Sequence, residues 1–256
     1  MQFSHRSSEL YAEFAVPGDT GTEQCRTLRG WPVRCAEHST GRYHTLTAGD
    51  ITALSARDRS RLAMAAADIL QEYLQGAACV LVCGLGNRHL TADSLGANVC
   101  SRLSVCGELP GGRGFYSFCP GVPAVTGIPT DTLVRMAAQC VSADRIIAVD
   151  ALCARSAANL SAVLQCSDTG LIPGSGASGS ETAGTGAKEE YPPEISTRTM
   201  PCPVVTVGVP TVIRTTLPDG GDRKYLVTGS DTDHVVESWS AVIASALLRA
   251  IFADGK

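Results

Sequence analysis

The chain has 256 residues, of which 44% are hydrophobic and 18% charged, so it can bury a substantial core as one large or two small domains. A formal net charge of −4 argues against a general nucleic-acid binder, because such proteins usually carry a basic surface. The first residues lack the apolar core of a signal peptide, and we identify no stretch approaching the ~18 apolar residues of a membrane span. We therefore expect a cytoplasmic protein with no nucleic-acid or membrane partner.

The predicted elements alternate between strands and helices. Residues 1–42, with several glycines and prolines, are expected to form an irregular N-terminal extension, and residues 43–256 a single α/β domain. Apolar periodicity predicts helices over residues 55–75, 91–103, 130–141 and 232–252. Short apolar runs predict strands over residues 78–83, 115–118, 145–149, 162–166 and 204–209. This alternation predicts a three-layer α/β sandwich with a mostly parallel sheet. Residues 173–200 are rich in glycine and serine near their start and are expected to form a mobile loop.

Eleven cysteines are an odd number, and none forms a Cys-x-x-Cys pair. Many stand where alanine or valine would serve, so we interpret them as small buried hydrophobic residues in a reducing compartment. Zinc sites need clustered cysteine and histidine ligands, and the sequence offers no convincing set. We expect neither a metal nor a cofactor.

Two aspartates follow predicted strands and are the main candidates for chemistry. Asp93 lies in the glycine-rich segment Gly84–Gly96, and Asp150 ends the apolar run 146–149. The carboxyl ends of parallel strands meet at the edge where ligands bind, and two carboxylates there can activate water. The structural alternatives are a first-turn aspartate in a helix capped by Thr91, and a carboxylate that caps the next loop with Arg155.

The glycine-rich segment favours a tight turn that approaches a ligand closely, with Gly84 and Gly86 following the strand. The dinucleotide pattern G-x-G-x-x-G fails because position 89 is histidine, so nucleotide binding is weakly supported. His89 lies near Asp93 and is a candidate to bind or tune the site, with an exposed loop histidine as the alternative.

The triplet Asp168-Thr169-Gly170 is typical of pepsin-like proteases, which use two such triplets in all-β folds. A single triplet in an α/β pattern does not support that class. Ser175, in the segment Pro173–Gly176, is a candidate for a loop that faces substrate. A Ser/His/Asp site lacks support, because G-x-S-x-G is absent and the histidines are scattered.

Taken in chain order, these segments resemble the germination protease family of spore-forming bacteria. The matching motifs are Gly84-Leu85-Gly86-Asn87 with Thr91, Asp93, Leu95 and Gly96; Pro120-Gly121-Val122 with Thr126-Gly127-Ile128; Asp150-Ala151-Leu152 with Ala154-Arg155-Ser156; Gln165 with Asp168-Thr169-Gly170 and Pro173-Gly174-Ser175-Gly176; Val204-Val205 with Gly208-Val209-Pro210-Thr211-Val212; and Leu226-Val227-Thr228.

The resemblance implies an atypical aspartic endopeptidase that starts the degradation of small acid-soluble spore proteins during germination, with Asp93 and Asp150 as its catalytic residues. It also implies a fold similar to the hydrogenase maturation proteases, a location in the forespore or spore core, a homo-oligomer such as a tetramer, and a zymogen. Self-cleavage after Glu13 is a hypothesis that follows from it. The supporting or substrate-binding residues it implies are Gly84, Gly86, Asn87, His89, Thr91, Asp168 and Ser175.

Two alternatives stay open, and three departures from the family pattern motivate the second of them. Arg88 replaces the usual tryptophan, Ala92 replaces the usual proline, and the segment after Gly176 lacks the usual basic cluster. One alternative is a metal-dependent maturation-type peptidase with His89 beside Asp93, and the other is a catalytically degenerate peptide-binding protein. For the aspartate pair, we expect Asp93 to be the ionised general base and Asp150 the protonated acid, although the reverse assignment is equally compatible with a coupled pair.

Overall fold

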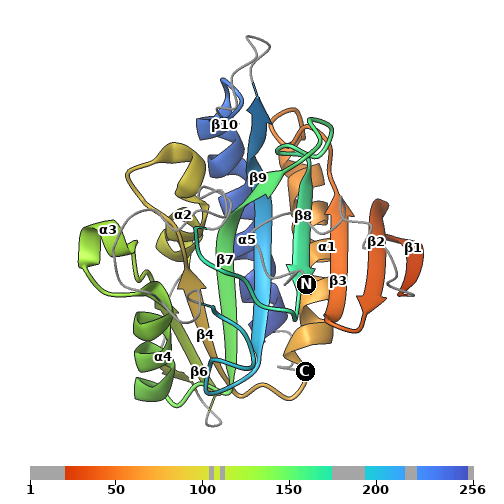
Figure 1. Ribbon diagram of the computed structural model, residues 1–256. Helices are drawn as coiled ribbons and strands as arrows, with labels where there is room; N and C mark the ends of the chain where they lie inside the picture. Colours follow the sequence, from red (N-terminus) through yellow and green to blue (C-terminus); the bar gives the residue numbers. More distant parts are fainter. Residues whose placement is uncertain (1–20, 104–106, 110–112, 175–193, 217–223, 253–256) are drawn as a thin grey trace.

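The computed structural model describes residues 21–103, 107–109, 113–174, 194–216 and 224–252, which form one mixed sheet with helices on both faces (Figure 1). The strands are β1 (Thr22–Leu28), β2 (Trp31–His38), β3 (Gly41–Thr47), β4 (Cys79–Gly84), β5 (Gly107–Leu109), β6 (Arg113–Phe118), β7 (Arg145–Ala154), β8 (Val163–Ser167), β9 (Val204–Thr216) and β10 (Lys224–Val227). The helices are α1 (Ala56–Leu74), the 3₁₀ turn η2 (Thr91–Asp93), α2 (Leu95–Arg102), α3 (Pro123–Thr126), α4 (Thr130–Cys140) and α5 (Thr232–Phe252).

The sheet order is β1-β2-β3-β8-β9-β7-β4-β6-β5, and β10 pairs with β9. The α/β class expected from the sequence is confirmed. Among the described strands, parallel pairing is confined to β6-β4-β7-β9. Helix α2 lies between β4 and β6 in the chain, and α4 lies between β6 and β7, as parallel neighbours require a crossover. All other described pairs are antiparallel, so the sheet is mixed rather than mostly parallel.

Residues 22–42 are not the irregular segment that we expected, because they form β1, β2 and the start of β3. Arg29 and Gly30 make a two-residue turn between β1 and β2, with φ of 52° and 90°. Positive φ at both positions matches the right-handed twist of a hairpin. Of the glycines and prolines that suggested irregularity, Gly30 therefore lies at a hairpin turn and Pro32 lies within β2, whereas residues 1–20 lie outside the described part of the chain.

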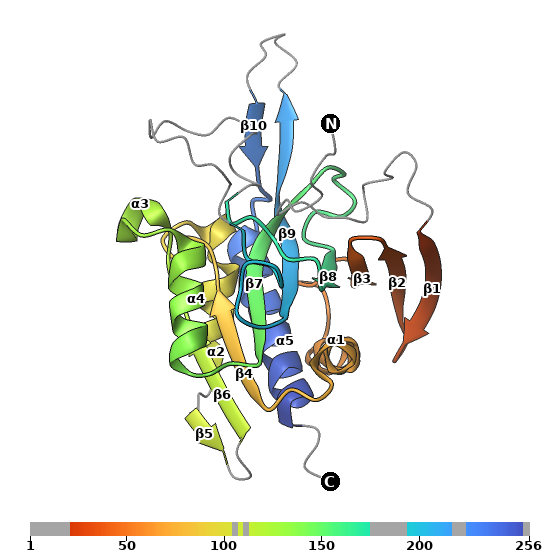
Figure 2. The same cartoon turned by 60° about the horizontal axis from the view of Figure 1, so that its bottom comes forward.

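One face of the sheet is covered by α1, α2 and α5, as Figures 1 and 2 show from two directions. Ser55 caps α1 by accepting a 3.1 Å hydrogen bond from the Asp58 backbone N–H, as its place before the apolar face predicts. Trp239 on α5 is fully buried, and its Nε1–H donates to the Ser161 carbonyl at 2.8 Å. The main apolar core lies between these helices and the sheet.

Helix α5 corrects the expectation that no segment approaches a membrane span. Its 21 residues are long and apolar enough to cross a membrane by length and composition, with an 18-residue window of mean hydropathy 1.5. In this fold, 56% of that window is buried. Burial against the sheet and α1 is the reason that a core helix carries such a composition.

The other face of the sheet is covered by α4 over β4 and β7, and by residues 194–202. Ile195 is fully buried and forms a β-bridge with Leu171, with backbone hydrogen bonds of 2.9 and 3.0 Å. Within the expected 173–200 loop, residues 173–174 form a turn, and the segment 194–200 is anchored by the buried Ile195. Residues 175–193 lie outside the described part of the chain.

Candidate functional site

Asp150 lies within β7 rather than at its end, because β7 continues to Ala154. Its neighbours Ile147 and Val149 join the core under α1, α2 and α5, whereas Ile146 and Ala148 join the opposite core. Alternation along the strand therefore places Asp150 on the second face. Only 3% of its surface is exposed, and its Oδ1 accepts a 2.9 Å hydrogen bond from the Ala151 N–H.

The strands beside Asp150 carry further polar residues. Asp150 pairs with Gly208 of β9, and Gly208 pairs with Gln165 of β8, which is also buried. A Cβ at Gly208 would lie 2.6 Å from the Leu152 Cγ and 2.9 Å from the Asp150 carbonyl oxygen, so glycine is required at this position. On the second face, Asp150 of β7 and Gln165 of β8 are therefore two buried polar side chains on either side of Gly208.

Asp93 occupies η2, the turn between β4 and α2. Its Oδ2 accepts a 2.7 Å hydrogen bond from the Asn87 backbone N–H. Burial raises the pKa of the Asp93 carboxyl above its usual value, and the hydrogen bond from Asn87 opposes this effect. The sequence-based expectation was a first-turn aspartate kept ionised by the helix dipole. That expectation is wrong in position, because α2 begins at Leu95.

Thr91 does not cap α2. The N-cap position of α2 is Ser94, and the Thr91 carbonyl oxygen accepts a 2.9 Å hydrogen bond from the Ser94 hydroxyl. The turn is tied to the sheet from the other side, because the Thr211 hydroxyl of β9 donates to the Ala92 carbonyl. Asp93 is thus held by a short turn anchored to β9, rather than by a regular helix end.

The segment Leu85–Gly86 connects the surroundings of the two aspartates. The Leu85 N–H donates to the Val149 carbonyl at 2.8 Å, directly before Asp150 in β7. Gly86 lies against Asp93, because a Cβ at Gly86 would lie 2.1 Å from the Asp93 carbonyl oxygen and 2.8 Å from its Oδ1. Asp93 and the residue directly before Asp150 therefore both contact the same two-residue segment.

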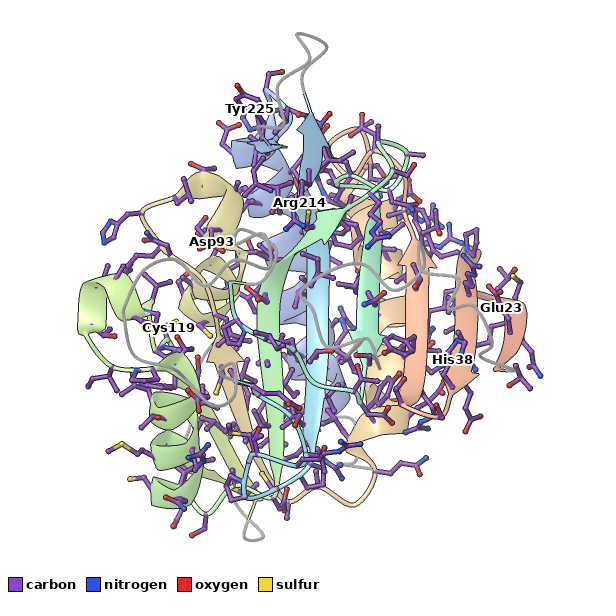
Figure 3. All side chains as sticks on the ribbon, viewed as in Figure 1. Glu23, His38, Asp93, Cys119, Arg214 and Tyr225 are labelled. Carbon is purple, nitrogen blue, oxygen red and sulfur yellow. The ribbon has the colours of Figure 1, made fainter. Side chains whose placement is uncertain are left out.

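Figure 3 shows Asp93 toward the end of the sheet where Arg214 of β9 is labelled. The chain reaches this end through two glycines with close neighbours. A Cβ at Gly84 would lie 2.3 Å from the Gly96 carbonyl oxygen, and one at Gly96 would lie 2.5 Å from the Val149 carbonyl oxygen. Because these glycines have no side chain, the backbone of α2 can lie directly against the backbones of β4 and β7. This packing places the η2 turn over the end of β4.

Asn87 and His89 form the outer part of the same turn. The Asn87 Oδ1 accepts a 3.0 Å hydrogen bond from the His89 N–H, which closes a local turn. The His89 residue is exposed and borders the cavity described next. Asn87 therefore supports Asp93 through its backbone and shapes the turn through its side chain.

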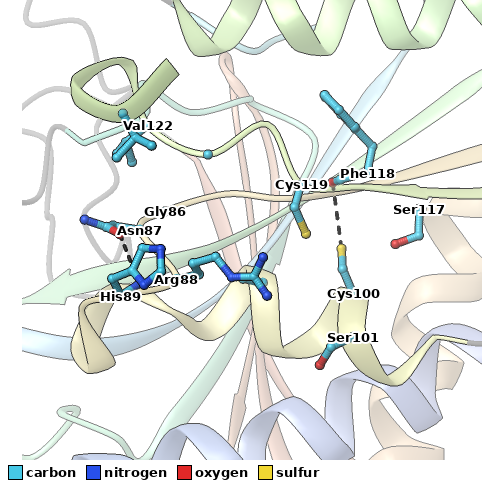
Figure 4. Close-up of a pocket in the computed structure, with 13 residues that line it drawn as sticks. Gly86, Asn87, Arg88, His89, Cys100, Ser101, Ser117, Phe118, Cys119 and Val122 are labelled. Carbon is cyan, nitrogen blue, oxygen red and sulfur yellow. Dashed lines mark hydrogen bonds between the residues drawn. The ribbon is translucent and has the colours of Figure 1, made fainter. Parts of the chain in front are cut away.

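A cavity of about 380 Å³ lies beside this turn, between α2, the end of β6 and α3 (Figure 4). We call it the α2–β6 cavity. Its lining residues come from three segments of the chain: Gly86–His89, then Ala97, Cys100 and Ser101, then Ser117–Cys119, Gly121, Val122 and Val125. Neither aspartate lines it, although Asn87 and Gly86 contact both the cavity and Asp93.

Sequence reasoning did not identify the α2–β6 cavity. The segment Pro120-Gly121-Val122 matches a family motif, but no local pattern in the sequence indicates that it faces α2. Its pairing partner is set by the parallel register of β6 on β4, which brings Phe118 beside Cys83. A cavity built by such a long-range pairing leaves no signal in local periodicity.

Asp168 is not brought to the two aspartates. Its Oδ1 accepts a 2.7 Å hydrogen bond from the Arg42 N–H, and its Oδ2 lies 3.1 Å from the Arg42 Nε. It follows β8, whose last residue Ser167 pairs with Thr206 near the start of β9. Asp150 pairs two residues further along β9, at Gly208. Asp168 therefore ties β8 to β3, and Ser175 lies outside the described residues.

A metal site would need several suitable donors together. In the described segments, no group of three or more His, Cys, Asp or Glu residues is placed to hold a metal ion. His89 and Asp93 therefore have no third ligand of this kind within that part of the chain, and the metal-dependent alternative has no donor set there.

A family model described as germination protease matches residues 32–220. The germination protease of Clostridium acetobutylicum is 33% identical over 77% of this chain and 58% of its own length. The germination protease of Bacillus subtilis is 32% identical over 68% of this chain and 48% of its own length. That of Caldanaerobacter subterraneus is 31% identical over 80% of this chain and 66% of its own length.

This chain thus spans between about half and two thirds of the length of these curated relatives. Among solved structures, the [NiFe] hydrogenase maturation protease HycI from Thermococcus kodakarensis overlaps with a TM-score of 0.41 and 16% identity, over 70% of this chain and 99% of that one. The match of the family model over most of the chain, with several relatives above 30% identity, confirms the resemblance found from the ordered motifs. The chain belongs to the germination protease family.

Proposed function

We propose that this protein is an endopeptidase that starts the degradation of small acid-soluble spore proteins during germination, with Asp93 and Asp150 as its hydrolytic pair. Membership in the germination protease family supports the peptidase activity. The observation that carries the choice of residues is the Leu85–Gly86 segment, which hydrogen-bonds to β7 directly before Asp150 and contacts Asp93. No other pair of carboxylates named by the sequence analysis shares a segment in this way.

In the proposed reaction, the pair holds one proton between two carboxylates. The ionised member removes a proton from water, and the protonated member donates its proton to the carbonyl oxygen or the leaving amine. Burial raises the pKa of Asp93 and so favours its protonated form. This direction opposes the expected role of Asp93 as the ionised base. We therefore assign the shared proton to the pair, without dividing base and acid between its members.

The tetrahedral intermediate would need hydrogen-bond donors for its oxyanion. Three N–H groups of the turn are already engaged: that of Leu85 by Val149, that of Asn87 by Asp93, and that of His89 by the Asn87 side chain. An oxyanion donor from this turn would therefore come from Gly86 or Arg88. The Arg88 side chain also borders the α2–β6 cavity, where it would meet an anionic group.

The test is digestion of a purified small acid-soluble spore protein by the full chain and by the variants Asp93→Asn and Asp150→Asn. We expect both variants to lose cleavage by a factor on the order of 10²–10⁴, because each removes a proton-transfer group while keeping the shape of the side chain. Asp168→Asn is the matched control, since Asp168 is held by Arg42 and adjoins neither aspartate.

Full cleavage by a folded Asp93→Asn or Asp150→Asn protein would exclude the pair. Loss of cleavage in the folded Asp168→Asn control would move the catalytic assignment to the Asp168 triplet. No cleavage by any form, with peptide binding retained, would favour the peptide-binding alternative. Activity that disappears with a chelator and returns with added metal would favour the metal-dependent alternative.

We further propose that the protein acts without a cofactor in the forespore or spore core, as a homo-oligomer. Light scattering of the purified full chain measures the oligomer directly. A monomer across the concentration range of the activity assay would contradict this part of the proposal.

A further inference from the structure

Two cysteines face each other at the α2–β6 cavity. Cys100 comes from α2, and Cys119 directly follows β6. Both residues line the cavity, and Figure 4 shows their sulfur atoms pointing toward one another. The Cys100 Sγ also lies 3.8 Å from the Phe118 carbonyl oxygen, a second acceptor within reach of the same thiol proton. The pair is therefore positioned by a helix and by a strand end.

The two thiols differ in accessibility. Cys119 is exposed to solvent, whereas Cys100 is buried, with 8% of its surface exposed. A reagent that enters the cavity therefore meets Cys119 first. Cys83 lies nearby but is fully buried in β4. Within the described cavity lining, Cys119 and Cys100 thus form one outer and one inner thiol.

The surroundings favour the thiolate at Cys119. The hydrogen bond from Cys100 and the positive charge of Arg88 lower the pKa of Cys119 to about 7, against the opposing effect of burial. The hydrogen bond with Cys119, together with burial, raises the pKa of Cys100. Cys119 is therefore the nucleophile of the pair and Cys100 the proton-bearing partner, the usual division between an attacking and a resolving thiol.

We propose that Cys119 is a modification site for low-molecular-weight disulfides, with Cys100 as the thiol that resolves the adduct. The Cys119 thiolate attacks one sulfur of the small disulfide, a protein–small-molecule disulfide forms, and the other half leaves as a thiolate that takes up a proton. Cys100 then loses its proton and attacks the Cys119 sulfur. A Cys100–Cys119 disulfide forms, and the second half leaves as a thiol.

The net reaction converts two protein thiols and one small disulfide into one protein disulfide and two small thiols. The small disulfide is the oxidant and the cysteine pair is the reductant, so electrons and protons balance. This chemistry does not depend on the peptidase activity, because it uses neither Asp93 nor Asp150.

The expected rate follows from thiolate content and nucleophilicity. At pH 7, a thiol with a pKa of about 7 is about half ionised, and one with the ordinary value of 9.0 is about 1% ionised. That gives about 50-fold more thiolate. The lower basicity reduces intrinsic nucleophilicity by about eight-fold over two pKa units, so Cys119 should react about six-fold faster than an ordinary thiol of equal access.

The experiment treats the full chain with oxidised glutathione and maps every cysteine by mass spectrometry over a range of pH. We expect the wild type to lose the thiols of Cys100 and Cys119 together and to form a disulfide between them. Cys100→Ala should instead keep one glutathione on Cys119. Cys119→Ser should leave Cys100 unmodified, and Cys140 on α4, exposed but outside the cavity, is the internal control.

The pH dependence separates a tuned thiolate from mere exposure. In Cys100→Ala the first attack at Cys119 should be slower than in wild type near pH 7, by up to about six-fold, and faster near pH 10, because its thiolate is then the more basic one. Arg88→Gln should shift the profile in the same direction. An equal rate at Cys119 and Cys140 at every pH would overturn the proposal, as would a stable adduct on Cys119 in the wild type.

Discussion

Gly86→Ala tests whether the Leu85–Gly86 segment positions Asp93. Gly86 has φ of +90°, a conformation that an alanine adopts at a cost of about 1–2 kcal/mol. The added Cβ would also lie 2.1 Å from the Asp93 carbonyl oxygen and 2.8 Å from its Oδ1, where no real Cβ fits. The η2 turn must therefore move, and the hydrogen bond from Asn87 to Asp93 must lengthen or break.

Gly76→Ala provides the matched control. Gly76 follows α1 with φ of +76°, so alanine meets a similar left-handed strain, but its Cβ would have nothing within 4 Å. The collision at Gly86 should add about 1–3 kcal/mol of destabilisation beyond this control, the usual cost of forcing atoms into a packed site. For a chain of this size, that corresponds to a melting temperature about 2–12 °C below that of Gly76→Ala.

The assay is urea unfolding of the wild type and both variants, followed by cleavage of the spore protein. We expect equal slopes against urea, a lower midpoint for Gly86→Ala than for Gly76→Ala, and a loss of cleavage in Gly86→Ala alone. Equal midpoints for the two variants would refute the collision. A destabilised Gly86→Ala protein with full cleavage would show that Asp93 need not be held where the structure places it.

Three further predictions concern charge and packing. In Asp93→Asn, stability at neutral pH should equal or exceed that of the wild type. The raised pKa of Asp93 means that the fold favours the protonated acid, so ionisation costs stability as pH rises above about 4, and asparagine avoids that cost. Melting curves from acidic to neutral pH should show the difference in melting temperature between variant and wild type growing with pH. Asp168→Ala should lose about 1–3 kcal/mol in urea unfolding, because the Arg42 N–H loses its acceptor, while cleavage persists; unchanged stability would contradict the structural role. Trp239→Phe should lose about 1–3 kcal/mol, because the Ser161 carbonyl loses its donor and a cavity opens; an unchanged urea midpoint would contradict that contact.

Local patterns in the sequence were sufficient for several elements. The 3.6-residue apolar period predicted α1 and α5, and Ser55 with Asp58 marked the start of α1 as the structure shows it. Continuous apolar runs predicted β4 and the start of β7. The ordered motifs were also enough to place the chain in its family. These features depend on contacts within a turn or within one strand, so neighbouring residues carry the information.

Other features were misread because their structure depends on partners far away in the chain. Residues 22–42 looked irregular, yet a two-residue turn at Arg29-Gly30 lets them join an antiparallel arm that β3 attaches to β8. Asp150 looked like a strand end, yet β7 continues because β9 pairs with it as far as Ala154. In both places the length of a strand was decided by the neighbouring strand.

By itself, the sequence determined the alternation of strands and helices from α1 to β7, the two aspartates worth testing and the family, since each depends on residue type and spacing. Only the tertiary structure decided that Leu85–Gly86 contacts Asp93 and hydrogen-bonds to Val149, directly before Asp150, and that Asp168 binds Arg42 instead. It alone also brought Cys100 and Cys119 together. The physical reason is that these pairings are set by the register of β4, β6, β7, β8 and β9, and register is fixed by packing across the whole sheet rather than by any local run of residues.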